Sequence, residues 1–195
     1  MAMGTWSDEA AWDSLTQTGA YLKGHFLLTT GRHSDQFFLL ARLTEHPDML
    51  EPWAKTLAER LASLDVQTVI GPAVGGIIPA FAVARHWPGS RVLFAEKDGD
   101  GGMAFKRGFR IEPGERVVLV EDAVTTGSSV AKVIAAVKGA GGEVAGVGAF
   151  VDRSHGPLAF EEPLTALLKV GNIPNWNADH CPLCQEGLPL TRPKS

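Results

Sequence analysis

The stretch "VVLVEDAVTTGSSV", residues 117–130, changes character twice within a short length. An apolar run leads directly into Glu121 and Asp122, and these acids are followed by glycine and small hydroxyl residues. A continuous apolar run predicts a strand that is buried on both faces. The small residues that follow predict a tight turn into a helix, where unpaired backbone amides favour an anion. The stretch therefore predicts a strand, an anion-binding loop and a helix in succession.

The same alternation extends over the surrounding chain. Short apolar runs alternate with helical segments, and the runs are too continuous to have a solvated face, so both faces of the sheet should be covered. This pattern predicts a parallel sheet flanked by helices, an α/β fold. Residues 164–170 could add an edge strand. The expected strands are 68–73, 91–96, 116–122 and 144–152, and the expected helices run from about 77 to 86 and from about 129 to 138.

The two ends of the chain do not follow this alternation. Apolar residues at helix-like spacing predict a helix within the first residues that stops at Gly24, and residues 51–63 predict another helix with Pro52 at its start. We expect one domain over residues 1–195, with a core at about 50–165. The segments 1–45 and 166–195 would form a small hood over the carboxyl edge of the sheet, where ligands of such folds bind.

Composition excludes several classes of protein. A chain of 195 residues can bury a real core within one domain. Its net charge of −4 gives no electrostatic footprint for a nucleic acid, and no apolar run is long enough to span a bilayer. Two cysteines close together near the C-terminus make no disulfide framework, which favours the cytoplasm. We therefore expect no nucleic-acid partner and no membrane partner.

The acids and the loop together suit a phosphorylated sugar. A phosphate fits amides at a helix start, but two carboxylates would repel it unless they contact another part of the same ligand. Ribose hydroxyls are donors and carboxylates are acceptors, so ribose 5-phosphate satisfies both halves. The same negative charge would stabilise a cationic sugar carbon during bond cleavage. The simpler alternative is a strand end with solvated acids and a hydroxyl helix cap.

Residues 117–129 resemble the signature of the type I phosphoribosyltransferases, which bind phosphoribosyl pyrophosphate (PRPP). The shared pattern is an apolar strand, two acids, two apolar residues, and then threonine, glycine and a small hydroxyl residue. The resemblance implies that Glu121 and Asp122 hold the ribose hydroxyls. It also implies that the residues after them bind the 5-phosphate: Ala123, Val124, Thr125, Thr126, Gly127, Ser128 and Ser129.

Two other segments resemble the orotate-specific members of this family. The segment "LLTTGRHSDQFF", residues 27–38, would supply Phe37 and Phe38 as an aromatic wall for a pyrimidine, although one of the two could be a core residue instead. The segment "FVDRSHG", residues 150–156, would supply Arg153 for the orotate carboxylate. By the same resemblance, Thr125 would also contact the base.

The segment "GPAVGGI", residues 71–77, resembles the family's pyrophosphate loop. Gly75 and Gly76 would let backbone amides approach a diphosphate closely. Members of the family often have a cis peptide bond at this place, which would fall at Ala73–Val74. The alternative is an ordinary strand-to-helix turn that needs glycine.

The chain departs from the family at three basic positions. Thr29, Gly75 and Glu96 stand where well-known members carry lysine or arginine. The mobile catalytic loop, which a neighbouring subunit lends in other members, is shortened to residues 96–108. A leaving diphosphate still needs positive charge. The candidate cations in this loop are Lys97, Lys106 and Arg107, of which Lys97 and Arg107 are expected to bind PRPP.

The resemblance implies transfer of the phosphoribosyl group from PRPP to orotate, with release of diphosphate. Glu121, Asp122 and Lys97 are the expected catalytic residues, and Mg²⁺ would be carried mainly by PRPP, with no protein metal ligands assigned. A homodimer is expected. Two alternatives stay open, namely a purine-type phosphoribosyltransferase and a non-catalytic regulator that senses PRPP or a nucleotide.

One metal-like pattern remains. Cys181 and Cys184 follow His180, but a structural zinc needs four ligands and the sequence shows only this cluster, so we assign no zinc site. His33 could contact diphosphate or a partner subunit, and is expected to be exposed.

Overall fold

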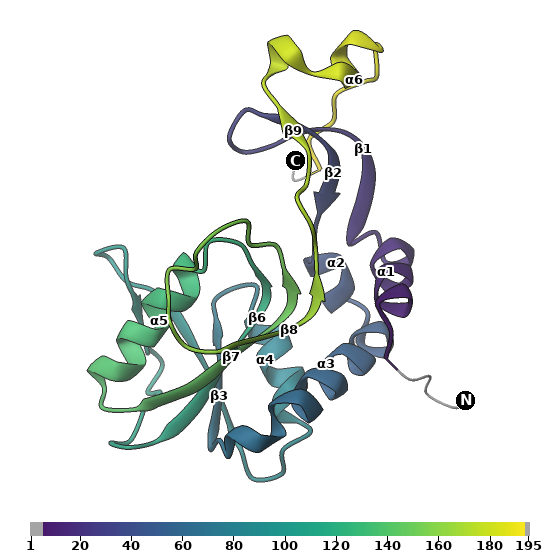
Figure 1. Ribbon diagram of the computed structural model, residues 1–195. Coiled ribbons are helices and arrows are strands. Elements are labelled where there is room, and N and C mark those ends of the chain that lie inside the picture. Colours follow the sequence, from purple (N-terminus) through teal and green to yellow (C-terminus); the bar gives the residue numbers. More distant parts are fainter. Residues whose placement is uncertain (1–5, 194–195) are drawn as a thin grey trace.

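The computed structural model describes residues 6–193 and contains two β-sheets, a large one and a small one above it (Figure 1). The large sheet has six strands in the order β5-β4-β3-β6-β7-β8. Its strands are β3 (Thr68–Pro72), β4 (Arg91–Lys97), β5 (Met103–Ala104), β6 (Arg116–Val124), β7 (Glu143–Asp152) and β8 (Leu164–Lys169). All neighbouring pairs are parallel except β4 and β5. The predicted α/β fold is confirmed, and β8 is the expected edge strand.

Helices cover both faces of the large sheet. Side chains of successive strand residues point to opposite faces, and they join two separate apolar clusters accordingly. Val118 and Val120 pack with α3 (Pro47–Leu61) and α4 (Ile77–Ala84), whereas Val117 and Leu119 pack with α5 (Ser128–Gly139). The strands are therefore buried on both sides, which is why their sequences lack polar alternation.

The small sheet forms the hood. It has the antiparallel order β1-β2-β9, with β1 (Tyr21–Leu27), β2 (His33–Phe38) and β9 (Asn175–Trp176), so it joins the N-terminal hairpin to the C-terminal segment. Around it lie α1 (Asp8–Gln17) and α2 (Ala41–Thr44), the 3-10 turn η2 (Ala178–His180) and α6 (Pro182–Gln185). A second 3-10 turn, η1 (Ala62–Leu64), follows α3. None of the helices within residues 6–193 has the length and apolarity that a membrane crossing requires.

Three expectations about local structure were wrong. The first helix ends at Gln17, and the apolar residues near Gly24 belong to a strand instead. The helix of residues 51–63 begins earlier, at Pro47, so Pro52 lies inside it. The strand that carries the acidic pair continues through Val124, because it pairs with β7 as far as Asp152.

Candidate active site

Most of the predicted ligand-binding residues lie near the point where the order of the sheet reverses. β3 and β6 are parallel neighbours, but the chain continues from β3 to β4 on one side and from β6 to β7 on the other. Such a switch point leaves a crevice at the carboxyl ends of the two strands, and open α/β sheets bind ligands there. The loop after β3 and the loop after β6 flank this crevice.

The acidic pair lies at the end of β6 and is largely buried. Glu121 is 8% exposed, and the amide of Ala123 donates to Oδ1 of Asp122 at 2.6 Å. Burial and the neighbouring charge of Asp122 raise the pKa of Glu121 to about 8. Burial likewise raises the pKa of Asp122, although hydrogen bonds from Ala123 and with Glu121 oppose it. The pair therefore holds a proton near neutral pH, and a donor-rich or cationic ligand would favour its ionised form.

The loop after the acids has free amides. Among the hydrogen bonds of residues 6–193, none joins the amides of Thr125, Thr126 or Gly127 to a carbonyl group of the chain. The amide of Ser128 lies 3.4 Å from Oγ1 of Thr126. Gly127 has φ of +74°, and a Cβ atom there would lie 2.5 Å from the ring of Phe160. Only glycine fits this turn, which leads into α5 and directs the unpaired amides into one place.

A small cavity marks that place. Its volume is about 50 Å³, and its lining combines one acid with the loop and the start of α5. Seven of the nine lining residues were predicted from the sequence to bind PRPP after the acids, and Glu121 was predicted for the ribose. The complete lining is Glu121, Ala123, Val124, Thr125, Thr126, Gly127, Ser128, Ser129 and Val130.

The loop after β3 lies against the acidic pair. A Cβ atom on Gly75 would lie 3.1 Å from Oδ2 of Asp122, so glycine lets the loop approach the carboxylate closely. The peptide bond between Ala73 and Val74 is cis, as the family resemblance implied. The amide of Ala73 donates to the carbonyl oxygen of Ala95 at 2.8 Å, which ties the loop to β4. Gly75 thus lies beside Asp122, and Gly76 lies beside Pro72 and the carbonyl oxygen of Val120.

Arg153 lies at the end of β7, next to the same edge. Its amide donates to the carbonyl oxygen of Val124 at 2.8 Å, and its guanidinium lies 4.9 Å from the ring centroid of Phe38. The Nε atom of Arg153 is buried without a hydrogen-bond partner. Burial lowers the pKa of Arg153, and the charge of Asp122 opposes this effect. A buried, unsatisfied guanidinium donor is costly, and a ligand carboxylate would satisfy it.

The shortened loop forms a β-hairpin in which two of the three candidate cations are already engaged. β4 and β5 pair Lys97 with Met103, and Oδ1 of Asp98 closes the turn by accepting from the amide of Gly102 at 2.6 Å. Arg107 donates twice to Glu96, at 2.9 and 3.0 Å.

Lys106 donates to the carbonyl oxygen of Lys97 at 2.8 Å. The side chain of Lys97 is exposed and forms no ion pair with any other residue in the described part of the chain. Lys97 is therefore the candidate cation that remains available to a ligand.

Comparison with known proteins agrees with this geometry. The phosphoribosyl transferase domain profile matches residues 40–183. The chain belongs to the phosphoribosyltransferase family. The predicted family is thereby confirmed.

Named relatives within this family are similar over nearly their whole length. The orotate phosphoribosyltransferase of Desulforamulus reducens is 48% identical over 94% of each chain, and that of Thermotoga maritima is 44% identical over 93% of this chain and 95% of its own. The crystal structure of orotate phosphoribosyltransferase from Aeropyrum pernix has a TM-score of 0.67 at 26% identity, and covers 81% of this chain and 92% of that one.

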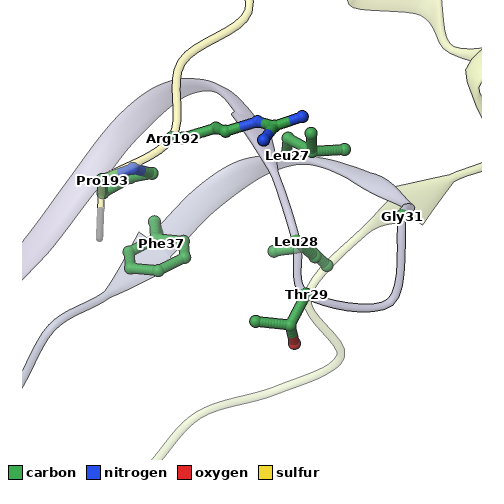
Figure 2. A pocket seen from close by; sticks show the side chains of 7 residues that line it. All are labelled: Leu27, Leu28, Thr29, Gly31, Phe37, Arg192 and Pro193. Atoms are coloured by element: carbon green, nitrogen blue, oxygen red, sulfur yellow. The ribbon is translucent and has the colours of Figure 1, made fainter. Parts of the chain in front are cut away.

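The two predicted phenylalanines of this phosphoribosyltransferase are separated. Phe38 packs between the core and Arg153, whereas Phe37 lies on the opposite side of β2 and contacts Phe26 at a centroid distance of 5.7 Å. Phe37 lines a pocket of about 430 Å³ between the tip of the hairpin and the C-terminal segment (Figure 2). The residues that line this pocket are Leu27, Leu28, Thr29, Gly31, Phe37, Arg192 and Pro193. The lining includes neither of the two acids, nor Arg153, nor any residue of the loop after β6.

The sequence indicated only the cysteine half of one cluster in the hood. Within the described residues, a single group of histidine, cysteine and acidic side chains could hold a metal ion, and it consists of His25, His33, Cys181 and Cys184. His33 is 5% exposed, so the expectation of an exposed histidine was wrong. His180, which the sequence placed beside the cysteines, lies outside the group. The sequence alone does not show that β1 pairs with β2, and this pairing is what brings His25 and His33 together.

Proposed function

We propose that this phosphoribosyltransferase transfers the 5-phosphoribosyl group of PRPP to orotate, giving orotidine 5-phosphate and diphosphate, in pyrimidine nucleotide synthesis. The observation that carries the proposal is the buried acidic pair that leads directly into a loop of unpaired amides at the switch point of the sheet. The sequence identity of 48% and 44% to relatives named orotate phosphoribosyltransferase supports orotate as the base.

In this proposal the phosphoribosyl group spans the end of β6. Amides and hydroxyls of residues 125–129 bind the 5-phosphate, while Glu121 and Asp122 accept hydrogen bonds from the ribose hydroxyls. Because the loop amides hold the 5-phosphate and the two acids hold the hydroxyls at the other end of the sugar, its C1 atom is fixed in position. The ionised acids then stabilise positive charge on the sugar as the bond to diphosphate breaks.

Arg153 and Phe38 are proposed to select the base. The unsatisfied Nε of Arg153 suits the orotate carboxylate, and the ring beneath the guanidinium keeps it in place. A purine base without a carboxylate would leave this buried donor unpaired. Thr125 is proposed to contact the base from the phosphate loop. We assign Phe37 to the hood pocket rather than to the base, because it lies on the other side of β2.

Mg²⁺ is proposed to enter with PRPP. The residues present fit such an ion, because a carboxylate of Asp122 lies directly against the diphosphate loop at Gly75 and oxygen ligands suit Mg²⁺. When bound, the ion supplies positive charge to the diphosphate. From the chain itself, we propose that the backbone of Gly75 and Gly76 and the side chain of Lys97 contact that group. Arg107 would have to leave Glu96 to join them.

A homodimer is part of the proposal. Val74, Ile78 and Phe81 are 82%, 47% and 58% exposed, and their spacing places them on one side of the diphosphate loop and α4. An exposed apolar surface beside an active site is suited to a second subunit. We also propose a cytoplasmic location, and one domain whose core is covered by the hood.

The test consists of an activity assay with orotate and a competition assay with purine bases, both on the full chain. Loss of orotate absorbance after addition of PRPP and Mg²⁺ supports the proposal, and adenine and xanthine are offered as competing bases. Turnover of a purine in place of orotate would support the purine-type alternative. Binding of PRPP without turnover of any base would indicate a regulator that senses PRPP.

A further inference from the structure

Four potential metal ligands from distant parts of the chain meet in the hood. They are His25 in β1, His33 in β2, Cys181 just before α6 and Cys184 within α6. One ligand atom of each residue lies within 4.8 Å of every other. Three of the side chains are buried, with His25 4%, His33 5% and Cys181 0% exposed, while Cys184 faces solvent. The cluster is thus part of the packed hood and not a group of surface side chains.

The separations match a tetrahedral site. Sγ of Cys181 and of Cys184 lie 3.5 and 3.6 Å from Nε2 of His25, and Sγ of Cys184 lies 3.3 Å from Nδ1 of His33. Zinc bonds of about 2.0 Å to nitrogen and about 2.3 Å to sulfur, at tetrahedral angles, place nitrogen and sulfur ligands about 3.5 Å apart. The two histidine nitrogens are 2.9 Å apart. Zinc would require about 0.4 Å more between them, which is a small shift of two rings.

Hydrogen bonding alone does not explain this convergence. Nδ1 of His25 lies 2.8 Å from the carbonyl oxygen of Leu188, and because a carbonyl group only accepts, Nδ1 carries the proton. In the neutral ring Nε2 then has only a lone pair, and this lone pair faces Nδ1 of His33 and both sulfur atoms at once. One lone pair satisfies one good donor, whereas a cation among the four atoms satisfies all of them. A carbonyl group behind a ligating histidine is also the usual arrangement in metal sites.

We propose that His25, His33, Cys181 and Cys184 bind one zinc ion in a closed structural site that fastens the C-terminal segment to the β1–β2 hairpin. Two thiolates and two imidazoles form a soft, tetrahedral ligand set that favours zinc over Mg²⁺ or Ca²⁺. All four positions are filled by the protein, so no open position is left for a substrate. The site is independent of the proposed transferase activity and stands even if the substrates differ.

The position of the cluster indicates what the zinc does. The tip of the hairpin, residues 28–32, lies between the two histidine ligands, so the ion holds both sides of the tip. Beyond α6, the amide of Thr191 donates to the carbonyl oxygen of His25 at 2.9 Å, and Leu27 donates to Thr191 at 2.9 Å. The next residues, Arg192 and Pro193, line the pocket with the tip (Figure 2). In Figure 1, α6 lies above β9, at the end of the hood away from the large sheet.

The first test is the metal content of the full-length wild-type protein, measured by plasma mass spectrometry after expression in zinc-supplemented medium without an affinity tag that binds metal. The expected result is one zinc per chain. The apoprotein should take up Co²⁺ with the intense absorption bands of a tetrahedral thiolate site. Protein that contains no zinc and gives no such bands would overturn the proposal. Loss of two hydrogen atoms by mass, which indicates a Cys181–Cys184 disulfide in place of a metal, would overturn it as well.

Variants assign the ligands. Cys184→Ser removes an exposed ligand and should abolish the Co²⁺ thiolate bands or weaken them severely, whereas His180→Ala is the matched control and should retain one zinc per chain. A strong chelator should lower the Tm of the wild type and leave that of Cys184→Ser unchanged. If His180→Ala loses the metal and Cys184→Ser keeps it, the ligand assignment is wrong. If Cys184→Ser does not fold, metal content and Co²⁺ spectra of the wild type still decide the matter.

Discussion

The carboxyl edge of the large sheet and the hood are built in opposite ways. At the edge, consecutive residues from Glu121 to Ser129 supply both the acids and the amides, so one strand, one turn and one helix start produce the site. In the hood, the cysteines lie between 151 and 159 positions from the histidines that they meet. A change at the edge should therefore remove a chemical group and leave the fold intact. A change in the hood should loosen the connection between the two ends of the chain.

Phe38 lies where the hood meets the carboxyl edge of the large sheet, so it tests this contrast directly. Among the substitutions considered, Phe38→Ala should have the largest effect. Its ring contacts Tyr21 at a centroid distance of 5.0 Å and the guanidinium of Arg153 at 4.9 Å, and it is 6% exposed. Phe38→Ala should lower the free energy of unfolding by about 3–5 kcal/mol, because it leaves a cavity in the core. Denaturant unfolding measures the loss. Phe37→Ala is the matched control and should cost clearly less, since Phe37 is only half-buried; equal losses would contradict the separation of the two rings.

Asp122 tests the edge alone. Asp122→Asn keeps the shape of the side chain and removes the charge that we propose to act in the transition state. We expect kcat/KM for orotate to fall about 100-fold or more, with little change in metal content. Asp179→Asn, in the exposed turn of the hood, is the matched control and should leave kcat/KM unchanged. Near-normal turnover in Asp122→Asn would remove this acid from the catalytic residues.

Glu121 makes the carboxyl edge of the large sheet sensitive to pH. Its pKa rises from 4.5 in the unfolded chain to about 8 in the folded protein, so between these values the folded state binds more protons than the unfolded state. By linkage, the stability of the ligand-free protein falls as pH rises through this window. A shift of this size corresponds to about 3–4 kcal/mol between roughly pH 5 and pH 8. Glu121→Gln should flatten this dependence in chemical unfolding curves, leaving the part due to Asp122. A variant with the same slope as the wild type would contradict the assignment.

Lys97 should give the smallest effect of the four. Its strand, β4, pairs with β3, which leads into the loop at Gly75, and the lysine forms no ion pair with an acid in the described part of the chain. Lys97→Ala should lower kcat about tenfold, because one cation near the leaving diphosphate is lost. Lys132→Ala, an exposed lysine of α5, is the control. Unchanged turnover in Lys97→Ala would leave the diphosphate to the backbone and the metal ion.

The same contrast explains what the sequence could predict. The edge is encoded locally, so short motifs placed the strand except for its last two residues, together with the acids, the turn glycine at Gly127 and the loop at Gly75. Arg153 was predicted through the resemblance of residues 150–156 to other family members, and its packing against Phe38 depends on how the hairpin docks. The cluster in the hood was missed, because a cysteine pair and two separate histidines form a pattern only after β1 pairs with β2 and α6 returns to them.

Two further differences have the same origin. Glu96 looked like a loss of positive charge, but in the fold it pairs with Arg107, and no rule of sequence spacing indicates this partner. Tyr21 and Leu22 have helix-like spacing, yet they form a strand because the hairpin pairs Tyr21 with Phe38 and Leu22 with Phe37. Short apolar segments are decided by such tertiary pairing and not by their own periodicity.

The most direct measurement is a crystal structure of the protein bound to ribose 5-phosphate. We predict that the phosphoryl oxygens accept hydrogen bonds from the amides of Thr125, Thr126 and Gly127, and that the sugar diol donates to Glu121 and Asp122. Calorimetry on Gly127→Ala, whose added methyl group would meet Phe160, should show much weaker binding of the same ligand. A sugar phosphate that binds elsewhere, or that leaves these amides without a ligand at saturating concentration, would contradict the account.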